Sequence, residues 1–276
     1  MVMSVNTNVG AQIALQNLNA TNSELAVTQN RINTGKSVSS AKDNGAIWAI
    51  AQGQRADIGA LGAVKQSLDR GIAAVDVALA AGETVSDLLL QMKEKALSAT
   101  DASLTTSARA ALNEDFKALR DQIASVTTNA EFNGVNLLKT GATGFQALAN
   151  AQGTASITVG AEVLALGGAN VTVATTQSID TLTKATASLT AVSTSIDKVS
   201  ASLARLGTKS KALSTHQTFV GKLSDALEAG VGNLVDADLA RESAKLQALQ
   251  TKQQLGVQAL GIANQTPQLV LSLFRS

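Results

Sequence analysis

The sequence predicts a mainly α-helical fold. The expected arrangement is a long antiparallel coiled-coil or helical-bundle rod that pairs N-terminal with C-terminal helices, with a small β-hairpin region in the middle of the chain. Two observations support it: apolar residues repeat with helical spacing near both ends, and a stretch rich in Gly, Ala, Thr and Val lies between them. Helices with narrow apolar seams cannot bury them alone, so we expect the two ends to pair.

The first helix is defined by a heptad repeat. Ala11, Leu18, Leu25 and Ile32 recur every seven residues, which is the spacing of a coiled-coil seam. Residues 33–40 are rich in Asn, Gly and Ser, and such clusters interrupt helices. We therefore expect this helix to end soon after Ile32.

Two further helices are expected before the middle region. The second begins near Asp43 and leads to a Ser- and Thr-rich turn at residues 101–107, and the third runs from about 107 to 128. Their apolar residues are spaced by three and four, as on one helix face. In the second helix they are Leu61, Val64, Leu68, Ile72, Val75, Leu79, Leu89, Met92 and Ala96; in the third they are Leu112, Phe116, Leu119 and Ile123.

The middle region, residues 132–176, has a different pattern. Residues 156–159 and 171–174 alternate polar with apolar side chains, and Gly167 and Gly168 lie between them. Alternation on both sides of a glycine turn is typical of a β-hairpin. We expect this hairpin at the far end of the rod.

The helical pattern returns after the middle region and continues close to the C-terminus. A break at residues 235–238 separates a long helix from a last one, which is expected to end near Pro267. The long helix has a heptad of Val199, Leu206, Leu213, Val220, Leu227 and Leu234, with Ile196, Leu203 and Leu223 as a second set; the last helix has Leu239, Leu246, Leu249, Leu255 and Leu260.

Composition excludes several classes of function. The chain has 22 basic and 21 acidic residues and a formal net charge of +1, so it lacks the basic surplus of a nucleic-acid-binding protein. It contains no cysteine and one histidine, so no disulfide, metal site or Cys- or His-based catalysis is expected. No apolar run is long enough for a membrane span, and no secretory signal peptide is recognisable.

Short patterns that resemble enzyme motifs are better explained as structural features. Gly35-Lys36-Ser37 matches the end of a phosphate-binding loop but lacks its first glycine. Asp236 and Asp238 could bind a cation, but an Asp just before a helix is usually an N-cap, and we favour the cap. His216 is expected to be half exposed on its helix. We therefore expect no catalytic residues, no metal and no cofactor.

Motifs at both ends of the chain resemble those of bacterial flagellin, the subunit of the flagellar filament. The resemblance covers roughly residues 4–140 and 190–274. The matching segments are residues 31–36 (Arg-Ile-Asn-Thr-Gly-Lys), 41–46 (Ala-Lys-Asp-Asn-Gly-Ala), 131–134 (Glu-Phe-Asn-Gly), 236–240 (Asp-Ala-Asp-Leu-Ala) and 263–268 (Ala-Asn-Gln-Thr-Pro-Gln).

The resemblance implies a domain organisation. Residues 1–45 together with 235–276 would form a terminal coiled-coil domain that lines the inner tube of the filament. Residues 46–234 would form an outer helical domain that carries the hairpin at about 132–176, and large variable outer domains would be absent. The residues that would connect the two domains are Arg31, Gly35, Lys36, Asp43, Asn44, Asp236 and Asp238.

The resemblance also implies a mode of assembly and several partners. Subunits that contact one another through unlike patches form open helical polymers. Partners would be other flagellin subunits, an export chaperone at the C-terminal segment, the flagellar type III export apparatus, and hook-associated and cap proteins. Nucleic acid and membrane are not expected partners. The residues expected to pack the filament are Leu18, Leu25, Ile32, Leu246, Leu249, Leu255, Leu260, Leu271, Leu273 and Phe274.

The expected location is the extracellular filament that drives swimming, reached without a cleaved signal peptide. Two alternatives remain at this stage: a hook–filament junction protein with related ends, and a monomeric helical binding module. Because flagellins are often O-glycosylated, candidate acceptors in the middle region are Thr154, Ser156, Thr172, Thr175, Thr176 and Ser178.

One segment departs from the family pattern. In many flagellins an Arg in the motif L-Q-R-x-R-E-L is recognised by the innate immune flagellin receptor of animals. Gln91 stands at that Arg position in this chain, whereas Glu114 is retained. We therefore predict weak or absent activation of the receptor.

Overall fold

The structure is a computed structural model that describes residues 7–273, with side chains over residues 7–265. The chain divides into two compact units. One contains the residues up to Ala56 and those from Ala226 onward, and the other contains Asp57–Asp225. The divisions fall inside helices α2 (Gly45–Ala99) and α4 (Leu182–Val235).

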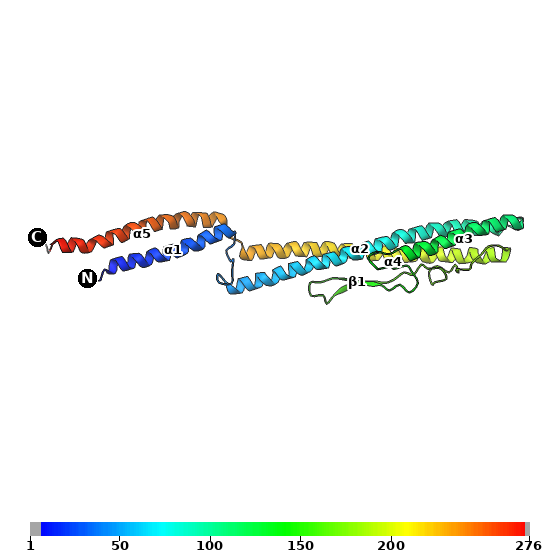
Figure 1. Ribbon diagram of the computed structural model, residues 1–276, viewed down its shortest axis with the longest axis horizontal. Helices are drawn as coiled ribbons and strands as arrows, with labels where there is room; N and C mark the ends of the chain where they lie inside the picture. The colour runs from blue at the N-terminus through cyan, green and yellow to red at the C-terminus, as the bar shows by residue number, and fades with distance from the viewer. Residues whose placement is uncertain (1–6, 274–276) are drawn as a thin grey trace. The chain divides into compact units, whose positions relative to one another are not determined.

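The terminal unit is built around two antiparallel helices, α1 (Val9–Thr34) and α5 (Leu239–Leu273), which lie side by side (Figure 1). The Asn8 side chain caps α1 by accepting a hydrogen bond from the Ala11 amide at 3.0 Å. Helix α1 ends at Gly35, whose left-handed φ of 68° places the chain in a conformation that L side chains rarely adopt. The predicted pairing of the N-terminal with the C-terminal helix is confirmed.

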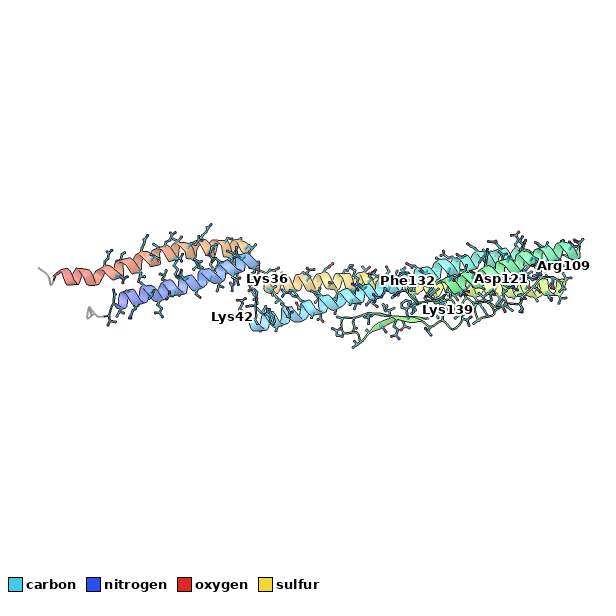
Figure 2. All side chains as sticks on the ribbon, viewed as in Figure 1. Lys36, Lys42, Arg109, Asp121, Phe132 and Lys139 are labelled. Atoms are coloured by element: carbon cyan, nitrogen blue, oxygen red, sulfur yellow. The ribbon has the colours of Figure 1, made fainter. Side chains whose placement is uncertain are left out.

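The larger unit packs α2, α3 (Thr106–Asn129) and α4 together, with the β region along their flank (Figure 1). The predicted apolar faces meet here: Leu68, Phe116, Ile123 and Leu213 are all fully buried. The Thr105 side chain caps α3, and Arg109, labelled in Figure 2, donates hydrogen bonds to the carbonyls of Ala99 and Asp101. These bonds close the turn between α2 and α3.

The hairpin differs from its prediction. Strand β2 (Ser156–Val159) is present, but its partner is β1 (Phe145–Leu148), in antiparallel register from Phe145–Val159 to Leu148–Ser156. The turn between them uses Asn150 and Gly153, not Gly167 and Gly168. The proposed strand 171–174 is therefore wrong. Its alternation is real, since Val171 and Val173 are buried, but the Thr172 amide donates to Ser195 of α4 and not to a strand.

The position of the hairpin is also different from the prediction. The Leu148 amide donates to Ser67 Oγ of α2, and the Ala149 carbonyl lies 2.7 Å from Nε2 of His216 on α4. These contacts place the hairpin along the sides of α2 and α4, whereas the α2–α3 turn forms one end of this unit (Figure 1). The hairpin forms no end cap because each strand has a buried side, at Ala147 and Val159, that needs the helices to cover it.

Serine side chains occupy core positions of α4 that the sequence did not indicate. Ser188, Ser195 and Ser202 are spaced by seven and are fully buried. Ser195 Oγ donates to the Ala191 carbonyl and accepts from the Thr172 amide, and Ser188 Oγ donates to the Ser178 carbonyl. We call these three residues the serine stripe. Two of its members bind the 172–178 segment to α4.

Candidate self-assembly surface

Helices α1 and α5 meet along one seam with a defined register. The Asn8 amide group donates to the Ala263 carbonyl at 2.7 Å, and Gln253 donates to Asn22 at 2.7 Å. Arg31 and Glu242 form an ion pair at 3.1 Å. Along these three pairs the residue numbers rise on α1 while they fall on α5, so the two helices are antiparallel.

The least exposed residues of both helices follow a three-and-four spacing and form this seam. In α1 they are Ala11, Ala14, Leu18, Thr21, Leu25, Thr28, Arg31 and Ile32; in α5 they are Glu242, Leu246, Leu249, Gln253, Gly256, Leu260 and Ala263. The two helices lie close together at Gly256, where an added Cβ atom would lie 3.3 Å from Leu18 Cδ1. Small residues at the seam permit this approach.

The residues expected to pack the filament divide into three groups. Leu18, Leu25, Ile32, Leu246, Leu249 and Leu260 lie in the seam of their own chain. Leu255 is 60% exposed on the outside of α5. The side chains of Leu271 and Leu273, together with Phe274, lie outside the described residues.

Sequence reasoning missed most of a second set of apolar residues on these helices and placed Leu239, which belongs to it, in the apolar pattern of the last helix. These residues are 45–68% exposed, and none lies in the seam. They are Val9, Ile13, Leu15 and Val27 on α1, and Leu239, Val257 and Ile262 on α5. Together with Leu255, these exposed residues are called the outer apolar face; they lie outside the seam, on more than one side of each helix. The available signal was apolar residues that fall outside the heptad seam, as Ile13 and Leu15 do.

The segment after α1 is hydrogen-bonded to the segment before α5. The Ser37 amide donates to the Val235 carbonyl at 2.7 Å, and the Ala237 amide donates to the Gly35 carbonyl at 2.9 Å. Lys36 and Asp236 face each other in an antiparallel bridge. We call this set of backbone bonds the linker clamp. It also explains the phosphate-loop-like sequence at residues 35–37, which is a turn bound to its own chain.

Side chains at both linkers cap helices, as expected for Asp238. Asp238 Oδ1 accepts hydrogen bonds from the Ala240 and Arg241 amides, so the cap interpretation is confirmed over the cation site. Asn44 Oδ1 accepts from the Ile47 amide at the start of α2. Among the residues that the structure describes, no group of three or more His, Cys, Asp or Glu could hold a metal ion.

Asp43 closes the linker between α1 and α2. Its Oδ2 atom accepts hydrogen bonds from both the hydroxyls and the amides of Ser39 and Ser40, at 2.8–3.2 Å. These bonds, the Ser39 hydroxyl first among them, hold the pKa of the Asp43 carboxyl below its ordinary value. Figure 2 shows Lys36 and Lys42 on the same linker.

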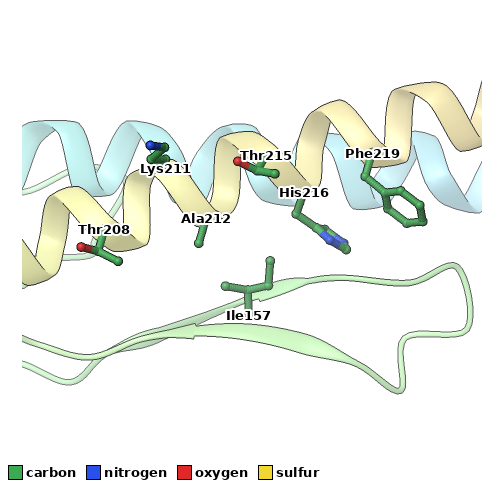
Figure 3. Close-up of a pocket in the computed structure, with 7 residues that line it drawn as sticks. All are labelled: Ile157, Thr208, Lys211, Ala212, Thr215, His216 and Phe219. Carbon is green, nitrogen blue, oxygen red and sulfur yellow. The ribbon is translucent and has the colours of Figure 1, made fainter.

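A shallow groove runs between α4 and β2 (Figure 3). Ile157 of β2 faces His216 and Ala212 of α4, and Phe219 is 55% exposed at one end. His216 is half buried as expected, and its ring lies 5.7 Å from that of Phe219. The His216 contact with the Ala149 carbonyl holds the hairpin turn against α4.

The remaining residues singled out in the sequence lie in the larger unit. Gln91 and Glu114 are exposed, and Glu114 forms an ion pair with Lys117 at 2.9 Å. Of the candidate glycosylation residues, Thr154, Ser156, Thr175 and Thr176 are exposed, whereas Thr172 and Ser178 are partly covered. No helix among the described residues is long and apolar enough to cross a membrane.

Comparisons with known proteins agree with the resemblance at both ends. The family model of the bacterial flagellin N-terminal helical region matches residues 5–143, and that of the C-terminal helical region matches residues 189–274. Flagellin FljM of Caulobacter vibrioides is 58% identical over 99% of this chain and 98% of its own length. A flagellin of Brucella melitensis is 38% identical over 99% of both chains.

One solved structure supports the fold. A Vibrio parahaemolyticus protein described as a flagellar hook-associated protein aligns with a TM-score of 0.56 at 14% identity, covering 70% of this chain and all of its own. At that identity the likeness concerns the fold alone. The family models and the full-length identity decide the assignment: the chain belongs to the bacterial flagellin family, whose members polymerise into the flagellar filament.

Proposed function

We propose that this flagellin joins neighbouring copies in the filament through the outer apolar face of α1 and α5. The observation that supports this is the exposure of large apolar side chains on helices whose common seam is already filled. Ile13, Leu255 and Val257 are 55%, 60% and 56% exposed. Apolar residues gathered on one unit of a protein that polymerises are typical of contact surfaces.

The seam residues have an indirect part in this proposal. Leu18, Leu25, Ile32, Leu246, Leu249 and Leu260 hold α1 against α5 and thereby present the outer apolar face. Leu255 contacts neighbouring copies directly, and Leu271, Leu273 and Phe274 extend the contact toward the C-terminus. In this assignment the terminal domain, residues 1–45 with 235–276, lines the inner tube, and residues 46–234 lie outside it.

The linker residues connect the two domains. The linker clamp at Gly35, Lys36 and Asp236 supports this role because it bonds the segment after α1 to the segment before α5. The caps at Asn44 and Asp238 support it because they fix where α2 and α5 begin. Asp43 stabilises the turn, and Arg31 stabilises the helix that leads into it.

The chain reaches the extracellular filament through the flagellar type III export apparatus, with a chaperone at its C-terminal segment. Composition supports export in an unfolded state: the chain contains no cysteine, so no disulfide can trap it, and a single proline limits slow isomerisation. Hook-associated and cap proteins are the chain's partners at the two ends of the filament. This location is tested by shearing filaments off cells and measuring the amount of the chain in the sheared filaments and in the cell pellet.

Assembly through the outer apolar face is tested by Val257→Asp. If Val257 is buried on assembly, its loss removes about 1.5–3 kcal/mol, which raises the critical concentration roughly 10- to 150-fold. Gln250→Asp is the matched control, because it adds the same charge at an exposed polar position of α5. Seeded assembly is followed by sedimentation and electron microscopy. Normal assembly of Val257→Asp would refute the proposal.

Glycosylation is proposed at the exposed hydroxyls of the middle region. Thr175 and Thr176 are exposed, and their hydroxyls make no hydrogen bond to the part of the chain that the structure describes, whereas the Thr172 hydroxyl donates to the Ala191 carbonyl and contacts Ser195. Thr154 accepts a bond from Asn150, and Ser156 donates to Gln146. Peptide mass spectrometry of native filament should find glycan on Thr175 or Thr176 before Thr172 or Ser178.

A further inference from the structure

The α1–α5 seam contains buried polar atoms that lack hydrogen-bond partners. Thr28 is fully buried, and its hydroxyl makes no hydrogen bond. Two other threonines of α1, Thr21 and Thr34, donate instead to the carbonyl four residues earlier. On α5, the Glu242 side chain is 12% exposed; one carboxylate oxygen binds Arg31, and the other has no partner.

These atoms belong to one layer of the seam. Arg31 faces Glu242 across the seam, and Thr28 lies three residues before Arg31, hence next to it on the same helix face. The neighbouring seam positions are apolar, with Leu25 and Ile32 on α1 and Leu246 on α5. We call Thr28, Arg31 and Glu242 the polar layer.

Stability alone gives no reason for the polar layer. A buried polar group without a partner costs free energy, and apolar side chains of similar volume in place of buried ionic groups are often neutral or stabilising. In coiled coils, buried polar residues are instead known to fix register and partner at a cost in stability. The polar layer is similar in composition to the buried polar residues that fix register in coiled coils.

Besides the polar layer, only the Asn8–Ala263 and Asn22–Gln253 hydrogen bonds are described as polar contacts between α1 and α5, and the apolar part of the seam leaves register and partner open. Leu18, Leu25 and Ile32 repeat every seven residues, so α1 presents a similar apolar face after a shift of one heptad. The linker clamp consists of backbone hydrogen bonds, which carry little sequence information. The exposed residues of the outer apolar face also allow α1 or α5 to pair with a helix of another copy in place of its partner in the same chain.

We propose that the polar layer selects the pairing of α1 with α5 of the same chain in the observed register. A shift of seven residues in one direction would place Glu242 opposite Glu24, a like charge, and in the other direction it would place Glu242 beyond the end of α1. Either shift separates the carboxylate from Arg31. Pairing through the outer apolar face would leave both charges without each other as well. This inference does not depend on which surface joins neighbouring copies.

Cysteine pairs can report the pairing directly, because the chain contains no native cysteine. Asn22→Cys with Gln253→Cys reports the observed register, since these side chains touch. Gln29→Cys with Gln253→Cys reports the one-heptad shift that moves Glu242 beyond the end of α1. Seven helical residues span about 10 Å, so this pair is too far apart for a disulfide in the observed register. Seeded filaments are oxidised, dissociated and separated on non-reducing gels.

The test variant is Thr28→Val with Glu242→Leu, introduced into both reporters. We expect the 22–253 intrachain disulfide to fall several-fold and interchain dimers or the 29–253 disulfide to rise. The control Asn19→Val with Gln250→Leu adds the same apolar groups at exposed positions of the same helices and should leave the pattern unchanged. An unchanged pattern in the test variant, or an equal change in the control, overturns the proposal.

A charge exchange keeps the test informative if the apolar variant does not assemble. Arg31→Glu alone places two carboxylates together and should lower the 22–253 disulfide. Arg31→Glu with Glu242→Arg restores opposite charges at the same positions and should recover it. Failure of the double exchange to recover the disulfide would show that the pair does not select the register.

Discussion

Ser195→Ala tests the role of the serine stripe. Ser195 is fully buried, and its Oγ atom accepts the Thr172 amide at 2.9 Å and donates to the Ala191 carbonyl at 2.7 Å. Removal of the hydroxyl leaves the Thr172 amide without an acceptor, whereas the Ala191 carbonyl still accepts from the Thr172 hydroxyl. One orphaned donor is therefore the main loss.

The magnitude follows from that loss and from one opposing effect. A buried unsatisfied donor costs about 1–3 kcal/mol, and the better helix propensity of Ala returns about 0.5 kcal/mol. We expect a net loss of roughly 0.5–2.5 kcal/mol. For a unit of this size, each kcal/mol lowers the melting temperature by about 2–4 °C.

Thermal unfolding followed by circular dichroism measures the global effect, and amide exchange at Thr172 measures the local one. The control is Ser200→Ala, because Ser200 is exposed on the same helix and donates only to the Ile196 carbonyl four residues earlier. The control should change stability by no more than about 0.5 kcal/mol. If Ser195→Ala matches the control and Thr172 exchange is unaltered, the stripe does not hold the 172–178 segment.

Further predictions concern the linker, the hairpin, the terminal helices and the receptor. Hydrogen bonds from Ser39 and Ser40 lower the pKa of the Asp43 carboxyl, so the stabilisation of the linker by Asp43 is present above the ordinary pKa of 3.8 and is lost as the pH falls through the lowered pKa. Fluorescence of Trp48, the only tryptophan of the sequence, should report this loss. Asp43→Asn should remove the pH-dependent transition. Gly144→Ala should disrupt the β1–β2 pair, because the added Cβ would clash with the Val159 carbonyl, whereas Gly160→Ala has open space and should not; strand amide exchange separates the two. Limited proteolysis of free monomer should remove both terminal arms, which become ordered on assembly, and arms that resist cleavage would contradict this expectation. A reporter-cell assay should show a weak receptor response that rises in Gln91→Arg; a native response equal to that of an Arg-bearing flagellin would argue against the receptor prediction.

Helices were predictable from the sequence because their signals are local. The seven-residue repeat of Leu18, Leu25 and Ile32 and the breaker cluster after it indicate a helix and its end without knowledge of a partner. The cap at Asp238 followed from the same local logic. The pairing of the two ends followed from the need to cover both seams.

The hairpin partner and the outer apolar face were less accessible because they depend on tertiary contacts. Val171 and Val173 alternate like a strand, but the backbone between them is satisfied by Ser195, which is distant in sequence. Residues Phe145–Leu148 carry a weak strand signal and pair because α2 covers Ala147, which lies beside Gly71. A heptad identifies a seam, but it does not say whether the seam is covered by the same chain or by another copy.

The directionality of the serine stripe has a mechanical consequence. A hydrocarbon contact keeps nearly the same energy when one surface slides along another, whereas a hydrogen bond weakens steeply once its atoms move out of line. Bonds from Ser188 and Ser195 therefore fix the 172–178 segment at one axial position on α4. In a filament that transmits torque, this attachment resists shear along the helix in a way that the same number of leucines would not.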